Sequence, residues 1–125
     1  MLADKKLNLK NEADIITEYF SPRIISEVNN EYVKLAKIRG EDIPWHNHKD
    51  EDELFYIIEG SLLMEIENQP SFEMKTGDLY VVKKGVNHRV SSHNDCLIML
   101  IESKSTQHTG DVVSDVTKNI DQQKY

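Results

Sequence analysis

Residues 40–53 read Gly-Glu-Asp-Ile-Pro-Trp-His-Asn-His-Lys-Asp-Glu-Asp-Glu, and an apolar run that ends at Gly60 follows them. In a β-strand every second side chain points to the same face, so His46 and His48 aim at one spot, roughly 7 Å apart along the chain. Neutral imidazoles combined with a carboxylate bind Zn, Fe, Ni, Mn or Cu. The stretch therefore predicts part of a metal pocket.

A second segment supplies a third histidine. Residues 77–88 read Gly-Asp-Leu-Tyr-Val-Val-Lys-Lys-Gly-Val-Asn-His, which places His88 after a short apolar run and a glycine-containing loop. If the three histidines and one carboxylate converge, the protein has a reactive centre. If they do not converge, the chain is an acidic β-domain whose sequence points to no chemistry.

The composition describes a small acidic globular protein. The chain has 125 residues, of which 38% are hydrophobic and 30% charged, and these values indicate one domain that can bury a core. The net charge is −7, and the fifteen Lys and Arg residues are scattered along the chain. These features argue against nucleic acid and against membrane surfaces as partners, and we expect a small-molecule ligand or substrate.

The sequence favours a reducing, intracellular compartment. Cys96 is the only cysteine, so the chain has no disulfide framework, and its apolar surroundings favour a packed thiol over a nucleophile. The first residues lack the apolar stretch of a secretion signal. The longest apolar runs are about six residues, far short of a membrane span. We therefore expect a soluble cytoplasmic protein.

Short β-strands separated by turns dominate the middle of the chain. Residues 32–38 alternate between two faces, and Gly60 between two apolar runs is a strong hairpin signal. Residues 93–95 predict another turn. The pattern predicts an all-β sandwich or barrel with strands near 23–28, 32–38, 54–58, 62–67, 72–74, 79–82, 88–91 and 96–101.

Both ends of the chain differ from this pattern. Residues 11–20 predict one or two helical turns with Ile15, Ile16, Tyr19 and Phe20 on one side, ended by Pro22. After residue 103 the chain becomes polar, as surface arms do. We expect an N-terminal arm at 1–22, a single barrel domain at 23–104 and a polar C-terminal arm at 105–125.

The spacing of these residues resembles the two signature motifs of the cupin superfamily of small β-barrel proteins. All five fixed positions of the first motif match, at Gly40, His46, His48, Glu53 and Gly60. The second motif matches at Gly77, Gly85 and His88, but Lys83 stands where the family usually has proline and Ser92 where it has asparagine. The chain is most similar to short single-domain cupins of the cupin 2 type. The resemblance implies a small antiparallel β-barrel, also called a double-stranded β-helix or jelly roll.

Carried over to this sequence, the resemblance implies that His46, His48, Glu53 and His88 coordinate one divalent transition metal: Fe, Mn, Ni, Zn or Cu. Four protein donors leave one or two coordination places for water or substrate. Asp50, Glu51 and Asp52 are also near. The family tolerates a gap of three or four residues before its glutamate, and a gap of three would select Asp52, the wrong residue type. Glu53 is therefore favoured.

The remaining candidates receive ordinary structural interpretations. His93 and His108 lie outside the motifs and are read as surface residues. Gly60, Gly77 and Gly85 are read as turn glycines. In a regular strand Trp45 faces away from His46, so we assign it to barrel packing or an interface rather than to a substrate platform.

Two functions from different classes follow. The first is a metalloenzyme, a dioxygenase, isomerase or lyase, acting on a small oxygen-rich metabolite. The second is a metal-dependent binding or sensing module without turnover. Proteins of this type are often called mannose-6-phosphate isomerase-like, which is an analogy of fold and assigns no reaction. The apolar outer faces of the barrel and the strands of residues 22–38 also suggest a homodimer.

Overall fold

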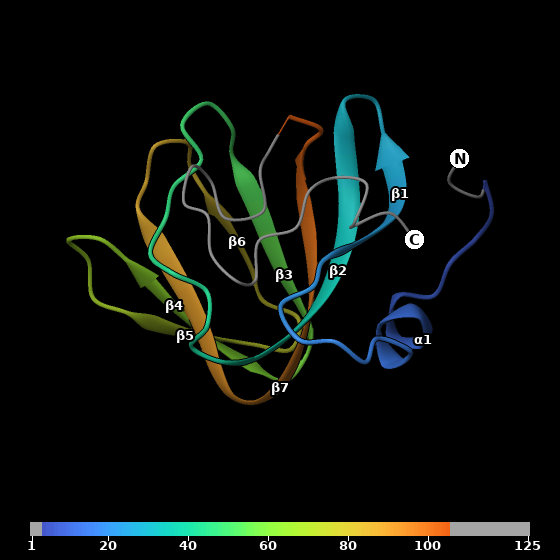
Figure 1. Ribbon diagram of the computed structural model, residues 1–125, viewed down its shortest axis with the longest axis horizontal. Coiled ribbons are helices and arrows are strands. Elements are labelled where there is room, and N and C mark those ends of the chain that lie inside the picture. The colour runs from blue at the N-terminus through green and yellow to red at the C-terminus, as the bar shows by residue number, and fades with distance from the viewer. Residues whose placement is uncertain (1–3, 106–125) are drawn as a thin grey trace.

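The computed structural model describes residues 4–105, which form one short helix and seven antiparallel strands (Figure 1). The elements in chain order are α1 (Leu9–Asp14), β1 (Arg23–Val28), β2 (Glu31–Gly40), β3 (Glu53–Glu59), β4 (Ser61–Ile66), β5 (Phe72–Lys75), β6 (Leu79–Val82) and β7 (His88–Ser103). The helical turn predicted near the N-terminus is present. The domain boundaries drawn from the sequence stay a prediction, and the arm predicted at 105–125, with His108, lies almost wholly outside the described residues.

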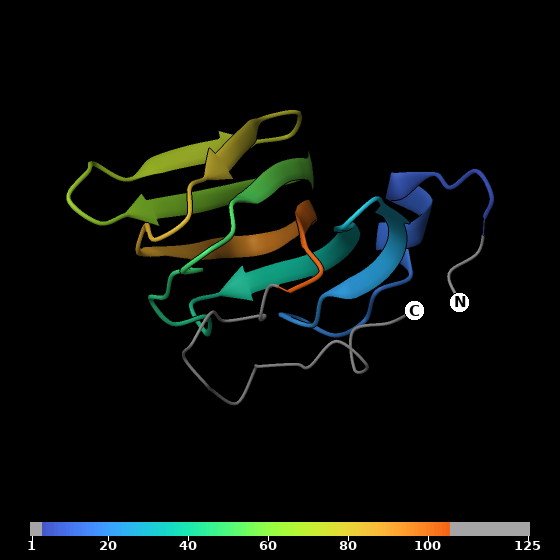
Figure 2. The ribbon, with the colours of Figure 1, turned by 90° about the horizontal axis from the view of Figure 1, so that it is seen from above.

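Strand β7 joins the two halves of the barrel. Its second part, residues 96–103, pairs with β2 and β3, and its first part, residues 88–91, pairs with β4. The larger sheet has the order β1-β2-β7-β3-β6, while β5 pairs with β4 on the other side. Seen from above, β1, β2 and β7 lie next to one another, with α1 beside β1 at one end (Figure 2). Side chains from both groups of strands form a common interior cluster. This arrangement confirms the expected small cupin-type β-barrel fold.

The sequence predicted two strands and a turn where the structure has the single strand β7. In Figure 1 this strand bends at its lower end, and the exposed residues His93, Asn94 and Asp95 lie between its two parts. The polar residues therefore turn the chain without interrupting its extended backbone. At this point Ser92 pairs with Gly40, and the hydroxyl of Ser92 lies 2.7 Å from the carbonyl oxygen of Ser61.

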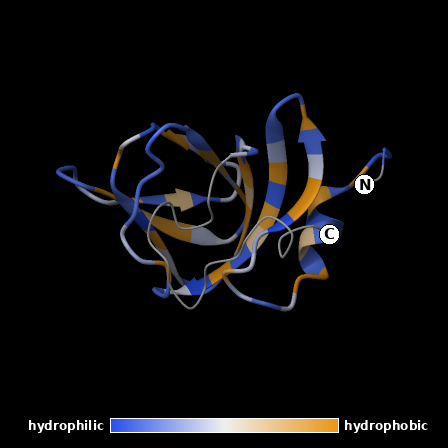
Figure 3. Ribbon diagram, turned by 45° about the horizontal axis from the view of Figure 1, so that its top comes forward, coloured by the Kyte–Doolittle hydropathy of each residue, from blue (hydrophilic) through white to orange (hydrophobic). Residues whose placement is uncertain are grey.

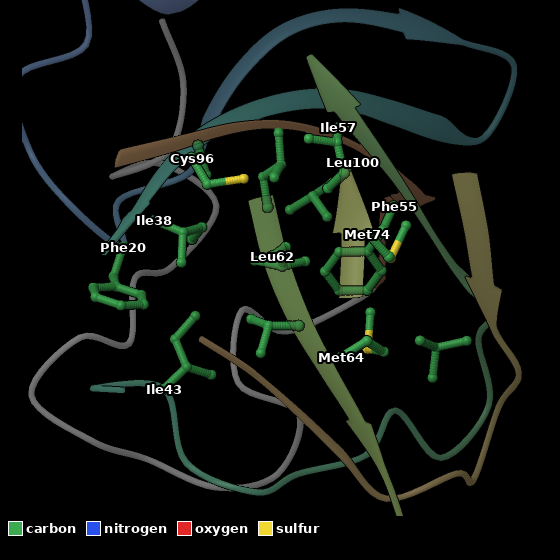
Figure 4. Packing of buried hydrophobic residues seen from close by; sticks show 14 of the residues in the cluster. Phe20, Ile38, Ile43, Phe55, Ile57, Leu62, Met64, Met74, Cys96 and Leu100 are labelled. Carbon is green, nitrogen blue, oxygen red and sulfur yellow. The ribbon is translucent and has the colours of Figure 1, made fainter. Parts of the chain in front are cut away.

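Alternation along the strands fills the barrel interior. On β3 the buried side chains are those of Glu53, Phe55 and Ile57, as the sequence predicted, and Leu54 and Tyr56 are less buried. Apolar residues are concentrated on the strands, and most of the connecting loops are hydrophilic (Figure 3). The apolar side chains of the interior form one cluster, drawn in Figure 4, to which six of the seven strands contribute. Glu53 is thus a carboxylate on the apolar face of its strand.

A second cluster covers the outer face of the larger sheet. Ala13 of α1 and Ile16 pack there with Leu35 of β2 and Leu97 of β7. Both faces of β2 and β7 are therefore covered, which explains why Lys34, Leu35 and Ala36 are buried in succession. The helix begins where the Asn8 side chain accepts a hydrogen bond from the Asn11 N–H. Within residues 4–105, the helix α1 is not long and apolar enough to span a bilayer.

The predicted helical face at residues 15–20 was wrong. Helix α1 ends at Asp14, Ile15 and Tyr19 are exposed, and Phe20 is buried in the barrel interior with a φ of +54°. The N–H of Phe20 donates to the carbonyl oxygen of Lys37, which fixes the chain beside β2. Tertiary burial of the phenyl ring outweighs the local preference for helix. Phe20 lies near Ile38 and Ile43 in Figure 4.

Gly60, between β3 and β4, provides a test of how closely this turn packs against β7. It has a φ of +107°, and an added Cβ would lie 2.7 Å from the backbone oxygen of Asp95. Gly77 also has a positive φ, +92°, but an added Cβ there would meet nothing within 4 Å.

We expect Gly77→Ala to lower the free energy of unfolding by about 1–2 kcal/mol through backbone strain alone. Gly60→Ala must cost more, because it adds a backbone clash to the same strain. Urea denaturation of both variants measures the difference. Equal losses would show that the approach of Asp95 to Gly60 is not rigid.

Candidate metal centre

The structure brings together His46, His48, Glu53 and His88, the four residues chosen from the sequence. One ligand atom from each residue lies within 4.8 Å of the ligand atoms of the others, and all four side chains are buried. Glu53 comes from the start of β3 and His88 from the start of β7, whereas the other two histidines lie in the segment between β2 and β3.

The two histidine segments meet through one pair of backbone hydrogen bonds. The N–H of His46 donates to the carbonyl oxygen of His88 at 3.0 Å, and the N–H of His88 donates to that of His46 at 2.9 Å. The expected strand through His46 and His48 is thus reduced to a single bridge. The N–H of Gly85 donates to the carbonyl oxygen of His48, so the loop before β7 fixes this residue as well.

Backbone carbonyl groups orient two of the imidazole rings. Nδ1 of His46 lies 2.9 Å from the carbonyl oxygen of Pro44, and Nδ1 of His88 lies 3.0 Å from that of Val86. A carbonyl oxygen only accepts hydrogen bonds, so Nδ1 carries the proton in both rings. The lone pair of Nε2 is then available in each ring, as metal ligation by a neutral imidazole requires.

The Nε2 atoms of His48 and His88 face the carboxylate of Glu53 but form no hydrogen bond with it. Nε2 of His48 and Nε2 of His88 have no hydrogen-bond partner in the described structure, and they lie 3.4 Å and 3.6 Å from Oε1 of Glu53. A charge-assisted hydrogen bond would be about 2.8 Å long. Two ligand atoms that are each about 2.1 Å from a metal ion lie about 3.0–3.4 Å apart at octahedral or tetrahedral angles. The donor set therefore suits a metal ion, and the two separations from Glu53 lie at or just above this range.

The surroundings keep the His46 imidazole neutral and the Glu53 carboxylate charged. Burial, followed by repulsion from His88, lowers the pKa of His46 to about 4. Burial by itself would raise the pKa of Glu53, but the neighbouring side chains of Glu102, His48 and His88 outweigh it and hold this pKa well below its ordinary value. Neutral imidazole and ionised carboxylate are the forms that bind a cation.

Two further residues of the site were missed from the sequence. Glu102 lies beside Glu53, and Nζ of Lys34 lies 2.6 Å from Oε1 of Glu102. Burial and the neighbouring Glu53 charge raise the pKa of Glu102 well above its ordinary value, although Lys34 opposes this shift. Both residues stand at inward positions of alternating strands, where a lysine and a glutamate are uncommon. A charged residue at an inward strand position was therefore the feature of the sequence that could have pointed to Lys34 and Glu102.

A small cavity adjoins three of the four residues, His46, Glu53 and His88. Its volume is about 30 Å³, which is enough for a few water-sized molecules. His46, Glu53, His88 and Glu102 supply its polar wall, and apolar side chains, Phe20 among them, supply the rest.

The other acidic residues of the first segment lie outside the cluster. Asp52 accepts a hydrogen bond from the backbone N–H of Lys84 at 2.9 Å, and its carboxylate lies 3.7 Å from Nζ of Lys83. Lys83, where the family usually has proline, therefore contacts the first segment. Glu51 accepts hydrogen bonds from the Asp50 N–H and from the Ser105 hydroxyl.

Two aromatic residues of the prediction lie outside the cavity. Trp45 faces away from the cluster, is partly exposed and has the guanidinium of Arg89 at 5.3 Å from its ring centre. His93 is exposed, as expected. Cys96 is buried, and burial raises the pKa of its thiol to about 12, which is consistent with a packed rather than a nucleophilic thiol.

Known proteins match the part of the chain that carries these residues. The family described as Cupin domain matches residues 38–102, and the uncharacterized protein YdbB of Bacillus subtilis is 35% identical over 103 residues, which are 82% of this chain and 90% of that protein. The chain belongs to the cupin family. A cupin-2 domain protein from Shewanella frigidimarina shares its fold with a TM-score of 0.74 and 36% identity, covering 78% of this cupin and 94% of that chain. Protein NMB1881 of Neisseria meningitidis is 32% identical with a TM-score of 0.72, covering 80% of this cupin and 100% of that chain.

The pKa of His46 predicts an acid-sensitive metal-free protein. The value is about 4 in the folded chain and 6.5 without these surroundings, so the unfolded chain binds the proton more readily. The stability that depends on neutral His46 is complete above pH 6.5 and is lost as the pH falls towards 4. The difference corresponds to about 3 kcal/mol.

Urea denaturation of the metal-free protein at pH 7 and pH 4.5 measures this loss. His46→Asn should remove about 2–3 kcal/mol of the pH dependence. His93→Asn, which changes an exposed histidine, should leave it unchanged. An undiminished pH dependence in His46→Asn would contradict the assignment.

Proposed function

We propose that this cupin binds one divalent transition metal through His46, His48, Glu53 and His88. The observation that carries the proposal is the pair of buried, unpartnered Nε2 atoms that face Oε1 of Glu53. Leaving such atoms without a partner in an apolar interior costs about 1–3 kcal/mol each. A metal ion would satisfy both nitrogens and the carboxylate at once.

We further propose that the site is catalytic and that its substrate is a small oxygen-rich metabolite. A bound metal with free coordination places would polarise a substrate oxygen or activate O₂. The chain itself holds the ligands rigidly through backbone hydrogen bonds, and the apolar wall of the cavity excludes bulk water. The reaction classes that suit this arrangement are those of a dioxygenase, an isomerase or a lyase.

The fold by itself does not select among these classes. The solved structure of hydroquinone 1,2-dioxygenase PnpCD, in complex with Cd²⁺, has a TM-score of 0.65 and covers 78% of this chain. It is only 14% identical, so the likeness concerns the fold. The proposal of a dioxygenase-type reaction depends on the donor set of this chain.

One observation favours a second function, a metal-dependent binding module without turnover. Apart from the three proposed ligands that line it, the cavity has one ionisable wall residue, Glu102, and this carboxylate is paired with Lys34. A separate general acid or base is therefore not evident among the described lining residues. The expected homodimer and the cytoplasmic location stay predictions in either case.

Metal analysis tests the site directly. The purified protein should contain about one transition metal ion per chain, and metal binding should raise the unfolding temperature. The double variant His46→Ala/His48→Ala should lose both properties, because it removes two of four ligands. The control His93→Ala should keep them. Full metal occupancy in the double variant would refute the site.

Turnover separates the two functions. The metal-loaded protein is screened for O₂ uptake, isomerisation and elimination with small diols, enols and keto acids. Product formation that disappears in the double variant supports the enzyme. Tight ligand binding without product in any metal form supports the binding module.

A further inference from the structure

Two glutamates stand directly opposite each other in the barrel interior. Glu53 on β3 and Glu102 on β7 are register partners, and both side chains are buried, with 4% and 2% of their surface exposed. Two carboxyl groups opposite each other on neighbouring strands destabilise a sheet when both are ionised, and burial increases that repulsion. This arrangement needs a physical reason.

Lys34 supplies part of the balance. Its side chain is fully buried on β2, and its ammonium group lies 2.6 Å from Oε1 of Glu102. The other oxygen, Oε2, meets no donor group in the described part of the protein. The ionisable side chain that faces Glu102 besides Lys34 is that of Glu53, its register partner. The three residues thus form a chain of contacts that ends at the metal centre.

Stability does not explain this chain. A buried ion pair usually contributes no more to folding than apolar residues of similar size, because desolvation offsets the attraction. Neither residue belongs to the two motifs, which span residues 40–60 and 77–92. The location of Lys34 and Glu102 beside Glu53 offers a better explanation of this chain of contacts.

We propose that Lys34 and Glu102 are positioning residues that hold the carboxylate of Glu53 in its ligating orientation. This inference rests on the metal site proposed above. Lys34 fixes Glu102, and Glu102 holds Glu53 from the side of β7, so that Oε1 of Glu53 is directed at His48 and His88. Groups that orient a metal ligand in this way commonly change metal affinity 10–100-fold when they are removed.

A pair of double variants separates positioning from folding. Lys34→Met/Glu102→Leu replaces the ion pair with apolar groups of similar size, a change that buried pairs usually tolerate. Lys34→Met/Glu102→Gln differs only at residue 102, where the amide can still donate a hydrogen bond to Glu53. Both variants lack the ammonium group, so a difference between them reports on the contact between residues 102 and 53.

The probe is cobalt(II), titrated into metal-free protein in competition with a chelator. We expect the Leu variant to bind cobalt(II) 10–100-fold more weakly than the wild type, with an altered visible absorption spectrum. The Gln variant should bind more tightly than the Leu variant but more weakly than the wild type, because residue 102 again contacts Glu53 while Lys34 no longer fixes it. Thermal unfolding of the metal-free variants shows whether each is folded.

Wild-type affinity and spectrum in both folded variants would overturn the inference, as would equal losses in both. If the Leu variant does not fold, Glu102→Asp takes its place, because it keeps the carboxyl group but withdraws it from Glu53 by one methylene. An unchanged cobalt(II) spectrum in Glu102→Asp would then overturn it. Failure of the wild type to bind cobalt(II) would instead refute the proposed metal site.

Discussion

The burial of one charged carboxylate in an apolar barrel is the constraint on which this structure depends. Glu53 occupies an inward position of β3 next to Phe55 and Ile57, where its charge is stable only with suitable partners. Imidazole nitrogens approach it from one side and Glu102 from another. The rest of the barrel excludes water from this group and makes its interactions strong.

Strand β7 is the element that makes this convergence possible. His88 and Glu102 are fourteen positions apart on it, about 46 Å in a straight strand, yet both line the same small cavity. The bend around residues 93–95 folds the strand back. Its two ends therefore face each other across the interior. The polar residues at the bend thus matter to the site although they lie far from it.

Much of the site was predictable because its signals are local. The separation of His46 from His48, the alternation that directs Glu53 inward and the glycine turns all act over a few residues. The choice of Glu53 over its acidic neighbours was also predictable, and the structure gives Asp52 a different role beside Lys84. The sequence predicted a helix near the N-terminus but placed it too far along the chain. The burial of Phe20 decides the path of the chain there.

The sequence by itself determined the β-rich fold and the four residues that converge, since spacing and alternation are properties of the chain alone. Only the tertiary structure decided which groups surround them. Lys34 and Glu102 are 68 positions apart in the sequence, and no local pattern relates them. They meet because β2 and β3 both pair with β7, which places a lysine, a glutamate and a proposed metal ligand on one buried face. Their effect depends on burial, which folding alone provides.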